Sequence, residues 1–123
     1  MIPTTLKATG AVMLTDELRT FIDEKLKKLE KLLDPNDQMV RADIEVATTG
    51  GARTGAQFRA EINLHFTGGF VRAEATREAM HPAIDEAVEE ARAELRKVVT
   101  KHRDLIRRGA SRVKDIFRYW SGK

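Results

Sequence analysis

Few residues in this sequence have the types and spacing that catalysis or metal binding requires. His65 lies in a predicted strand, while His81 and His102 lie toward opposite ends of one predicted helix, and none of them forms the H-E-x-x-H pattern that places two zinc ligands on one helix face. The chain has no cysteine, which excludes disulfides, thiolate catalysis and cysteine-ligated metals. It also lacks the G-x-S-x-G motif of a nucleophilic serine. We therefore predict that the protein is not an enzyme and has no metal and no cofactor.

The glycine-rich stretch from Gly50 to Gly55 has the G-x-x-x-x-G spacing of a phosphate-binding loop. In such a loop the next two residues are Lys and Ser or Thr, which contact the phosphates and the metal ion. Here these positions hold Ala56 and Gln57. The stretch is therefore interpreted as a flexible hairpin tip, within which Arg53 is the group able to contact a phosphate.

Basic side chains are the remaining functional candidates, and they are unevenly distributed. The 123-residue chain has a net charge of +3, yet residues 101–123 alone contain eight basic and two acidic side chains. A near-neutral body with a basic end indicates an anionic partner, with nucleic acid as the first candidate. The alternative is a solvated segment that only keeps the protein soluble, and charge does not separate the two. The size predicts one domain, and without a signal peptide or long apolar run we expect a cytoplasmic protein.

Two predicted helices position most of these cations. Residues 80–108 have apolar residues at three- and four-residue steps, which predicts a helix with one buried stripe: Met80, Ile84, Ala87, Val88, Ala91, Leu95 and Val98. Its other faces are acidic first and basic later, in agreement with the helix dipole, so we expect the basic end to project. A second helix should begin after the N-cap Thr15 and end at Asp34-Pro35, with Lys27, Lys28 and Lys31 away from its apolar stripe and Lys25 beside it.

The remaining segments alternate with a period of two, which is typical of half-buried strands. Alternation covers residues 40–46 and 58–66, and after the turn Thr67-Gly68-Gly69 a further strand covers 70–76. Residues 4–9 form a shorter β-prone run. The order β-α-β-β-β-α predicts an α+β fold, in which two helices cover one face of a four-stranded sheet and the first strand pairs in parallel. The other face should be charged and balanced, without aromatic residues for base stacking.

Several of these segments resemble one known family, the ribosome hibernation promoting factor / ribosome-associated inhibitor A family, also called protein Y or sigma-factor modulation protein. The resemblance is carried by residues 18–31, by Ala73-Glu74-Ala75, by Met80 to Asp85, and by Leu95-Arg96-Lys97 with Lys101 to Asp104. It covers roughly residues 4–108 and is specific in aggregate, because element order, hairpin positions and both helix patterns agree.

The resemblance implies a fold similar to a double-stranded-RNA-binding domain and a partner, the small ribosomal subunit. The protein would occupy the channel of mRNA and tRNA and block translation, as part of ribosome hibernation in stationary phase or stress. The alternative is a generic RNA- or protein-binding adaptor of the same fold. Family members use basic side chains of both helices against ribosomal RNA, which makes these residues the RNA-binding candidates: Lys25, Lys27, Lys28, Lys31, Arg92, Arg96, Lys97, Lys101 and Arg103.

The chain continues beyond the family-like domain, residues 1–108, into a basic C-terminal tail, residues 109–123. Nothing strand-rich follows Arg108, so the chain resembles the short form of the family. Apolar residues at helical spacing from Val113 to Trp120 predict a short amphipathic helix. Its candidate RNA contacts are Arg112, Phe117, Arg118, Tyr119 and Trp120. Two roles remain open: covering an apolar edge of the domain, or contacting single-stranded RNA by charge and stacking.

Overall fold

The segments that alternate with a period of two form one four-stranded sheet. The computed structural model describes residues 2–49 and 58–107, with side chains described as far as Lys101. The strands are β1 (Thr4–Thr9), β2 (Arg41–Thr48), β3 (Phe58–Phe66) and β4 (Gly69–Arg77), in the spatial order β1-β2-β3-β4. β1 pairs with β2 in parallel, and the other two pairs are antiparallel. The predicted strand order and pairing are confirmed.

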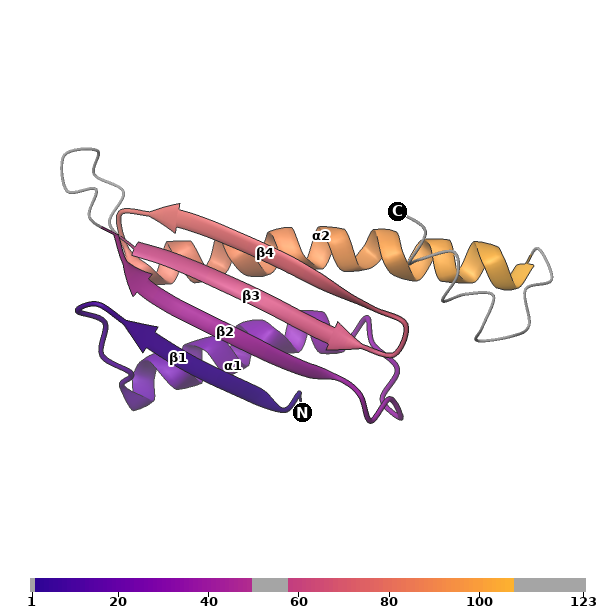
Figure 1. Ribbon diagram of the computed structural model, residues 1–123, viewed down its shortest axis with the longest axis horizontal. Coiled ribbons are helices and arrows are strands. Elements are labelled where there is room, and N and C mark those ends of the chain that lie inside the picture. Colours follow the sequence, from indigo (N-terminus) through magenta and orange to yellow (C-terminus); the bar gives the residue numbers. More distant parts are fainter. Residues whose placement is uncertain (1, 50–57, 108–123) are drawn as a thin grey trace.

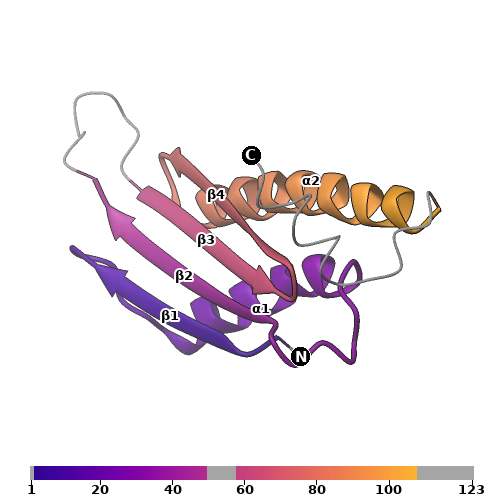
Figure 2. The ribbon, with the colours of Figure 1, turned by 45° about the vertical axis from the view of Figure 1, so that its right-hand side comes forward.

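Two helices cover one face of this sheet, as predicted (Figure 1). They are α1 (Asp16–Glu30) and α2 (Met80–Arg107). α1 lies behind β1 and β2, whereas α2 lies against β3 and β4 and extends beyond the end of the sheet (Figures 1 and 2). Both helices start near the same end of the sheet and run in the same direction. Their basic C-terminal parts therefore lie toward the same end of the molecule.

The core lies between the sheet and the two helices. Every second residue of β2, β3 and β4 is buried, including Ile44, Ile62 and Leu64. α1 contributes Leu18, Ile22, Leu26 and Leu29, and α2 contributes Ala83, Ile84, Ala87, Val88, Ala91 and Leu95. The alanines of α2 recur every four residues, so one side of this helix is flat and can approach the strands closely. The buried stripe of α2 stops at Leu95, while Val98 and Val99 are half-buried.

α1 begins where the sequence predicts and ends earlier. The Thr15 Oγ1 atom accepts a hydrogen bond from the Leu18 N–H at 3.1 Å, which confirms the predicted N-cap. The helix stops at Glu30, with Lys31 as its C-cap, and not at Asp34-Pro35. The N–H groups of Leu32 and Leu33 form tighter turns to Leu29 and Glu30. The prediction of the helix end was wrong because Leu32 and Leu33 continue the apolar pattern. They pack against the core, but they belong to a turn that follows the helix.

A carboxylate fixes the end of the β3–β4 hairpin. Asp37 accepts hydrogen bonds from the N–H and the hydroxyl of Thr67 at 2.9 and 2.7 Å, and from the N–H of Met39 at 2.9 Å. The neighbouring Gly68 has a φ of 92°, a conformation that glycine adopts without strain. Burial raises the pKa of Asp37, but the bonds from Thr67 and Met39 outweigh it and leave the pKa below its usual value. The loop before β2 and the hairpin are therefore held together.

Candidate nucleic-acid interface

The open face of the sheet carries many charges, and most of them neutralise one another. Arg59 contacts Glu61 at 2.6 Å and also contacts Glu74, while Arg72 lies 3.3 Å from Glu61. Asn63 donates a further hydrogen bond to Glu61 at 3.0 Å. The bond from Asn63 first, and then Arg59 and Arg72, hold the pKa of Glu61 below its usual range. Arg59 and Arg72 are therefore occupied by neighbouring carboxylates, and Arg41 lies 3.6 Å from Asp43, whereas Lys7 is exposed and forms no ion pair among the described residues.

Aromatic side chains on this face do not form a platform for bases. Phe70 is 53% exposed at the sheet edge, and its ring stacks on that of His65 with centroids 5.7 Å apart. The prediction that this face has no aromatic residue was wrong for Phe70, which lies opposite His65 in the β3–β4 register. A single ring already stacked within the protein differs from the two or three exposed rings of RNA-recognition sheets. The helix face is therefore the better candidate.

On the helix face, two predicted RNA-binding lysines of α1 are paired with acids of α2. The Lys25 Nζ atom lies 2.8 Å from the Asp85 carboxylate, and the Lys28 Nζ atom lies 2.9 Å from that of Glu89. Lys25 also lies over the ring of Phe21, 5.3 Å from its centroid. Its side chain is only 25% exposed. These pairs join the second half of α1 to the first half of α2.

The N-terminal parts of the two helices are also joined by side-chain contacts. The His81 Nε2 atom lies 3.0 Å from a carboxylate oxygen of Glu17. The ring of His81 meets Phe21 edge to face at 4.3 Å between centroids. His81 thus bridges the N-terminal turns of the two helices through packing and a polar contact. This arrangement explains a histidine that the sequence left without a role.

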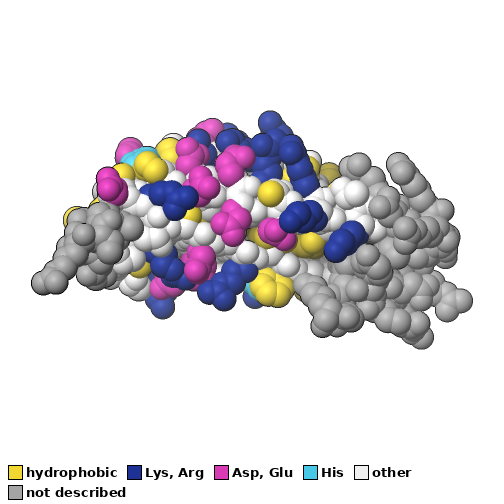
Figure 3. All heavy atoms as spheres, turned by 90° about the horizontal axis from the view of Figure 1, so that it is seen from above, with side chains coloured by type: hydrophobic (Ala, Val, Ile, Leu, Met, Phe, Trp, Pro, Cys, Tyr) yellow, Lys and Arg dark blue, Asp and Glu magenta, His cyan; other side chains and the backbone are white. Residues whose placement is uncertain are grey.

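Beyond Glu89 the cations outnumber the acids. Among the described residues, Lys31, Arg96 and Lys101 are exposed and form no ion pair. We call these three residues, together with Lys97, the basic end. Lys97 pairs only within its own helix, with Glu94 at 3.2 Å, and Lys27 pairs similarly with Glu24 at 3.0 Å. Figure 3 looks onto the edge formed by β4 and α2, and shows acidic and basic side chains mixed over its middle and basic ones toward the larger grey region.

Along α2, Arg92 lies between the paired acids Asp85 and Glu89 and the basic end. Its Nη1 atom lies 3.6 Å from Glu89, and its Nε atom is buried without a hydrogen-bond partner in the described part of the chain. A buried guanidinium N–H without an acceptor is unusual. Arg92 therefore retains hydrogen-bonding capacity that its present neighbours do not use.

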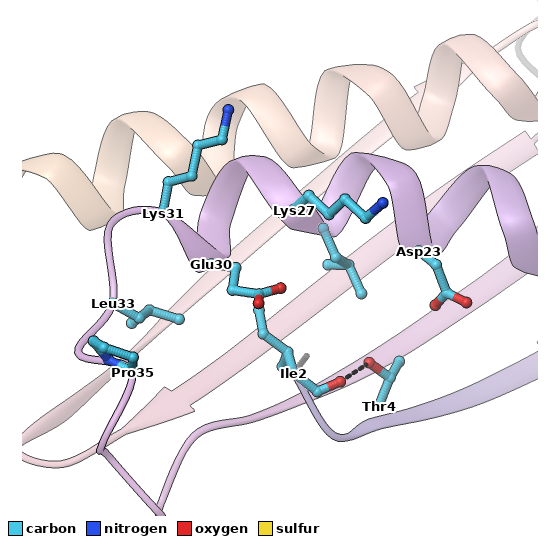
Figure 4. A pocket seen from close by; sticks show the side chains of 9 residues that line it. Ile2, Thr4, Asp23, Lys27, Glu30, Lys31, Leu33 and Pro35 are labelled. Atoms are coloured by element: carbon cyan, nitrogen blue, oxygen red, sulfur yellow. Dashed lines mark hydrogen bonds between the residues drawn. The ribbon is translucent and has the colours of Figure 1, made fainter.

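A pocket of about 600 Å³ lies under the other side of α1, next to β1 (Figure 4). Ile2, Leu26, Leu33 and Pro35 supply its apolar lining, while Lys27 and Lys31 stand at its edge with their amines turned outward. The apolar lining offers no recognition of phosphate. The lysines at its edge are therefore grouped with the helix surface and not with the pocket.

Some predicted residues cannot be placed. Arg103 lies within α2, but its side chain is not among those described. The tail candidates lie outside the described residues, as does the glycine-rich stretch with Arg53: Arg112, Phe117, Arg118, Tyr119 and Trp120. Within residues 2–49 and 58–101, no group of histidines and carboxylates is arranged to hold a metal ion. No helix of the described chain is long and apolar enough to cross a membrane.

The structure places two further residues, Asp85 and Glu89, against the candidate lysines. The sequence shows that the first half of α2 is acidic, which points to these residues. What the sequence lacked was the helix register, which brings these acids against Lys25 and Lys28. The sequence pattern gives the charge of each helix separately, whereas the candidate interface contains side chains of both helices.

Comparisons with known proteins agree with the fold. Residues 8–103 match the family described as sigma 54 modulation protein / S30EA ribosomal protein. The fold is similar to the protein Y N-terminal domain of Thermus thermophilus, with 25% identity and a TM-score of 0.64, covering 78% of this chain and 96% of that one. It is also similar to a ribosomal subunit interface protein from Coxiella burnetii, with 18% identity, a TM-score of 0.61 and the same coverage.

No curated protein matches the sequence. The family match nevertheless spans most of the chain, from within β1 to within α2, and so includes every element of the described fold. The expected resemblance is confirmed at the level of the family, whose description refers to ribosomal proteins. The chain belongs to the sigma 54 modulation protein / S30EA ribosomal protein family.

Proposed function

We propose that this protein binds the small ribosomal subunit in the channel of mRNA and tRNA and blocks translation by occupying it. The family is one of ribosome-associated proteins, and a structural relative is named a subunit interface protein. The observation that carries the proposal is the basic end, where Lys31 after α1 and Arg96 and Lys101 on α2 are exposed and lack anionic partners in the described chain. Ribosomal RNA supplies phosphates that such cations bind with release of counterions.

The proposed contact surface is centred on the basic end. Lys31, Arg96, Lys97 and Lys101 form its centre, with Arg103 as its continuation along α2. Lys27 lies at its edge. Lys25, Lys28 and Arg92 contribute after they exchange a carboxylate for a phosphate. Tail residues 109–123 would extend the contact along single-stranded RNA, as their charge and aromatic content suggest.

Inhibition by occupancy needs no catalytic group and no cofactor. It requires only a rigid body that competes with mRNA and tRNA for the same RNA surface. The sheet and α2 provide such a body, because the helix is anchored on β3 and β4 through buried residues from Ala83 to Leu95. We infer a cytoplasmic location from the same partner.

Sedimentation tests the partner and the mechanism together. In sucrose gradients of cell lysate, the protein should migrate with ribosomal particles, and at low magnesium with the small subunit. Purified protein should then inhibit translation of a reporter mRNA in vitro, and excess mRNA or initiator tRNA should reduce its binding. Protein that remains at the top of the gradient while still binding RNA would favour the alternative, a generic RNA-binding adaptor.

A further inference from the structure

The acids in the first half of α2 occupy cations that would otherwise extend the basic end along the contact between the two helices. Asp85 holds Lys25 at 2.8 Å, and Glu89 holds Lys28 at 2.9 Å while lying 3.6 Å from Arg92. Three of the predicted RNA-binding residues thus already have an anionic partner from within the protein. The unpaired cations begin one helical turn further along.

These ion pairs can exchange with phosphate without disturbing the core. The side chains of Lys28 and Glu89 are 41% and 46% exposed, and those of Lys25 and Asp85 are 25% and 49% exposed. Exposed pairs contribute little to stability. An RNA phosphate offers the same charge as the carboxylate, so binding replaces one pair with another. The net gain at these cations is smaller than at a free cation such as Arg96.

Two further observations support an exchange centred on Glu89. The hydrogen bond from Lys28 holds the pKa of Glu89 below its usual value, so this carboxylate is charged throughout the neutral range. The Arg92 Nε atom is buried without a partner in the described chain. The carboxylate of Glu89 therefore restrains two cations, one of which has an unused donor.

We propose that Asp85 and Glu89 are internal competitors of RNA, which confine the RNA-binding surface to the basic end and limit binding to arbitrary RNA. The inference rests on the proposed function, because it assumes that the helix cations contact RNA. Repulsion of a wrong ligand is a general route to specificity. An RNA that reaches only one of these ion pairs gains little binding free energy there. An RNA that presents phosphates to both Lys25 and Lys28 can displace both acids.

The test compares Glu89→Gln with Glu90→Gln. Both variants lose one negative charge from neighbouring positions of α2, but Glu90 is exposed and forms no ion pair among the described residues. The probe is a fluorescein-labelled oligouridine of about 20 nucleotides, titrated at several salt concentrations. Glu89→Gln should bind it roughly three- to fivefold more tightly than Glu90→Gln, since one ion-pair restraint is removed. Its salt dependence should steepen by about 0.7 for each cation released.

A double-mutant cycle identifies the cation that is released. Lys28→Gln should change oligouridine binding little in the wild-type background, because Glu89 already occupies Lys28. In the Glu89→Gln background the same change should cost most of the gained affinity, and this coupling is what the competitor role requires. Thermal melts monitored by circular dichroism should show that all variants are folded.

The results separate this inference from the proposed function. Equal binding of oligouridine by Glu89→Gln and Glu90→Gln, or an additive cycle, would overturn the competitor role even if the protein binds small subunits. Failure of the wild-type protein to bind purified small subunits would overturn the proposed function. In that case tighter, coupled binding of Glu89→Gln to oligouridine would still support the competition between acid and RNA.

Discussion

The open sheet face and the helix face are both rich in charge, but they use it differently. On the sheet, Arg59 and Arg72 are held by Glu61 and Glu74 in one network. On the helix face the ion pairs between the two helices stop at Glu89, Lys97 pairs only within α2, and Arg96 and Lys101 form no ion pair in the described chain. The number of basic residues is therefore a poor guide to where RNA binds. What distinguishes the two faces is where unpaired cations gather: Arg96 and Lys101 lie about one turn and a half apart on α2, whereas Lys7 is an isolated unpaired cation of the described sheet face.

Charge reversal at the basic end should give the largest effect. Replacing Arg96, Lys97 and Lys101 together with Glu should weaken binding to purified small subunits by at least about 100-fold, because each lost phosphate contact also loses counterion release. The three side chains are exposed and lie off the buried stripe, so the fold should be retained. Fluorescence anisotropy with labelled protein measures the affinity. Unchanged binding with an unchanged melt would refute this site.

The matched control reverses three cations of the sheet face. Lys7, Arg41 and Arg72 are also exposed, and their replacement with Glu changes the net charge by the same amount. If only the helix face contacts RNA, this variant should bind far better than the helix variant at the same salt concentration. Equal losses in the two variants would mean that overall charge, and not the location of the cations, governs binding.

Loss of the sheet network should lower stability more than binding. Glu61→Gln removes the acceptor shared by Arg59, Asn63 and Arg72, and should cost about 1–2 kcal/mol of unfolding free energy near neutral pH. The folded state holds the pKa of Glu61 below the ordinary 4.5, so its contribution is present above about pH 4.5 and is lost as the pH falls through the folded-state pKa.

The comparison is made by denaturant unfolding at several pH values. The difference between wild type and Glu61→Gln should narrow from pH 7 to pH 3, while Glu78→Gln, at an exposed position, should show little difference at either pH. A difference that does not depend on pH would contradict the assigned role of the Glu61 charge.

Single neutralisations on the helix face should give the smallest and most diagnostic effects. Arg96→Gln should weaken small-subunit binding by roughly three- to tenfold and reduce the salt slope by about 1. Lys25→Gln should change it by less than about twofold, because Lys25 is paired with Asp85 and packed on Phe21. Binding isotherms at three salt concentrations give the affinity and the salt slope of both variants. A larger loss for Lys25 would reverse the order of the two regions.

The fold was largely predictable because its elements follow local rules. Alternation over residues 58–66 matches β3 residue for residue, and the apolar stripe from Met80 correctly marks the start of α2. The end of α1 was missed because Leu32 and Leu33 continue the apolar pattern after the backbone has left the helix. Periodicity reports which side chains are buried, but it does not report the backbone geometry that buries them.

The candidate site was only partly predictable. The basic character of Arg96 and Lys101 is a property of the sequence, but their lack of partners depends on where the acids of α2 stop. The occupation of Lys25 and Lys28 depends on contacts between residues about 60 positions apart, which the period within one helix does not contain. The tail candidates from Arg112 to Trp120 stay a prediction.

Amine footprinting of the wild-type protein tests the central claim most directly. Brief acetylation with and without purified small subunits, followed by mass spectrometry, reports the accessibility of each lysine. Lys31, Lys97 and Lys101 should become protected in the complex, while Lys7 on the open sheet face should react as in the free protein. Protection of Lys7 with unchanged reactivity of the three helix-face lysines would show that the protein binds the ribosome through its sheet and would contradict the account.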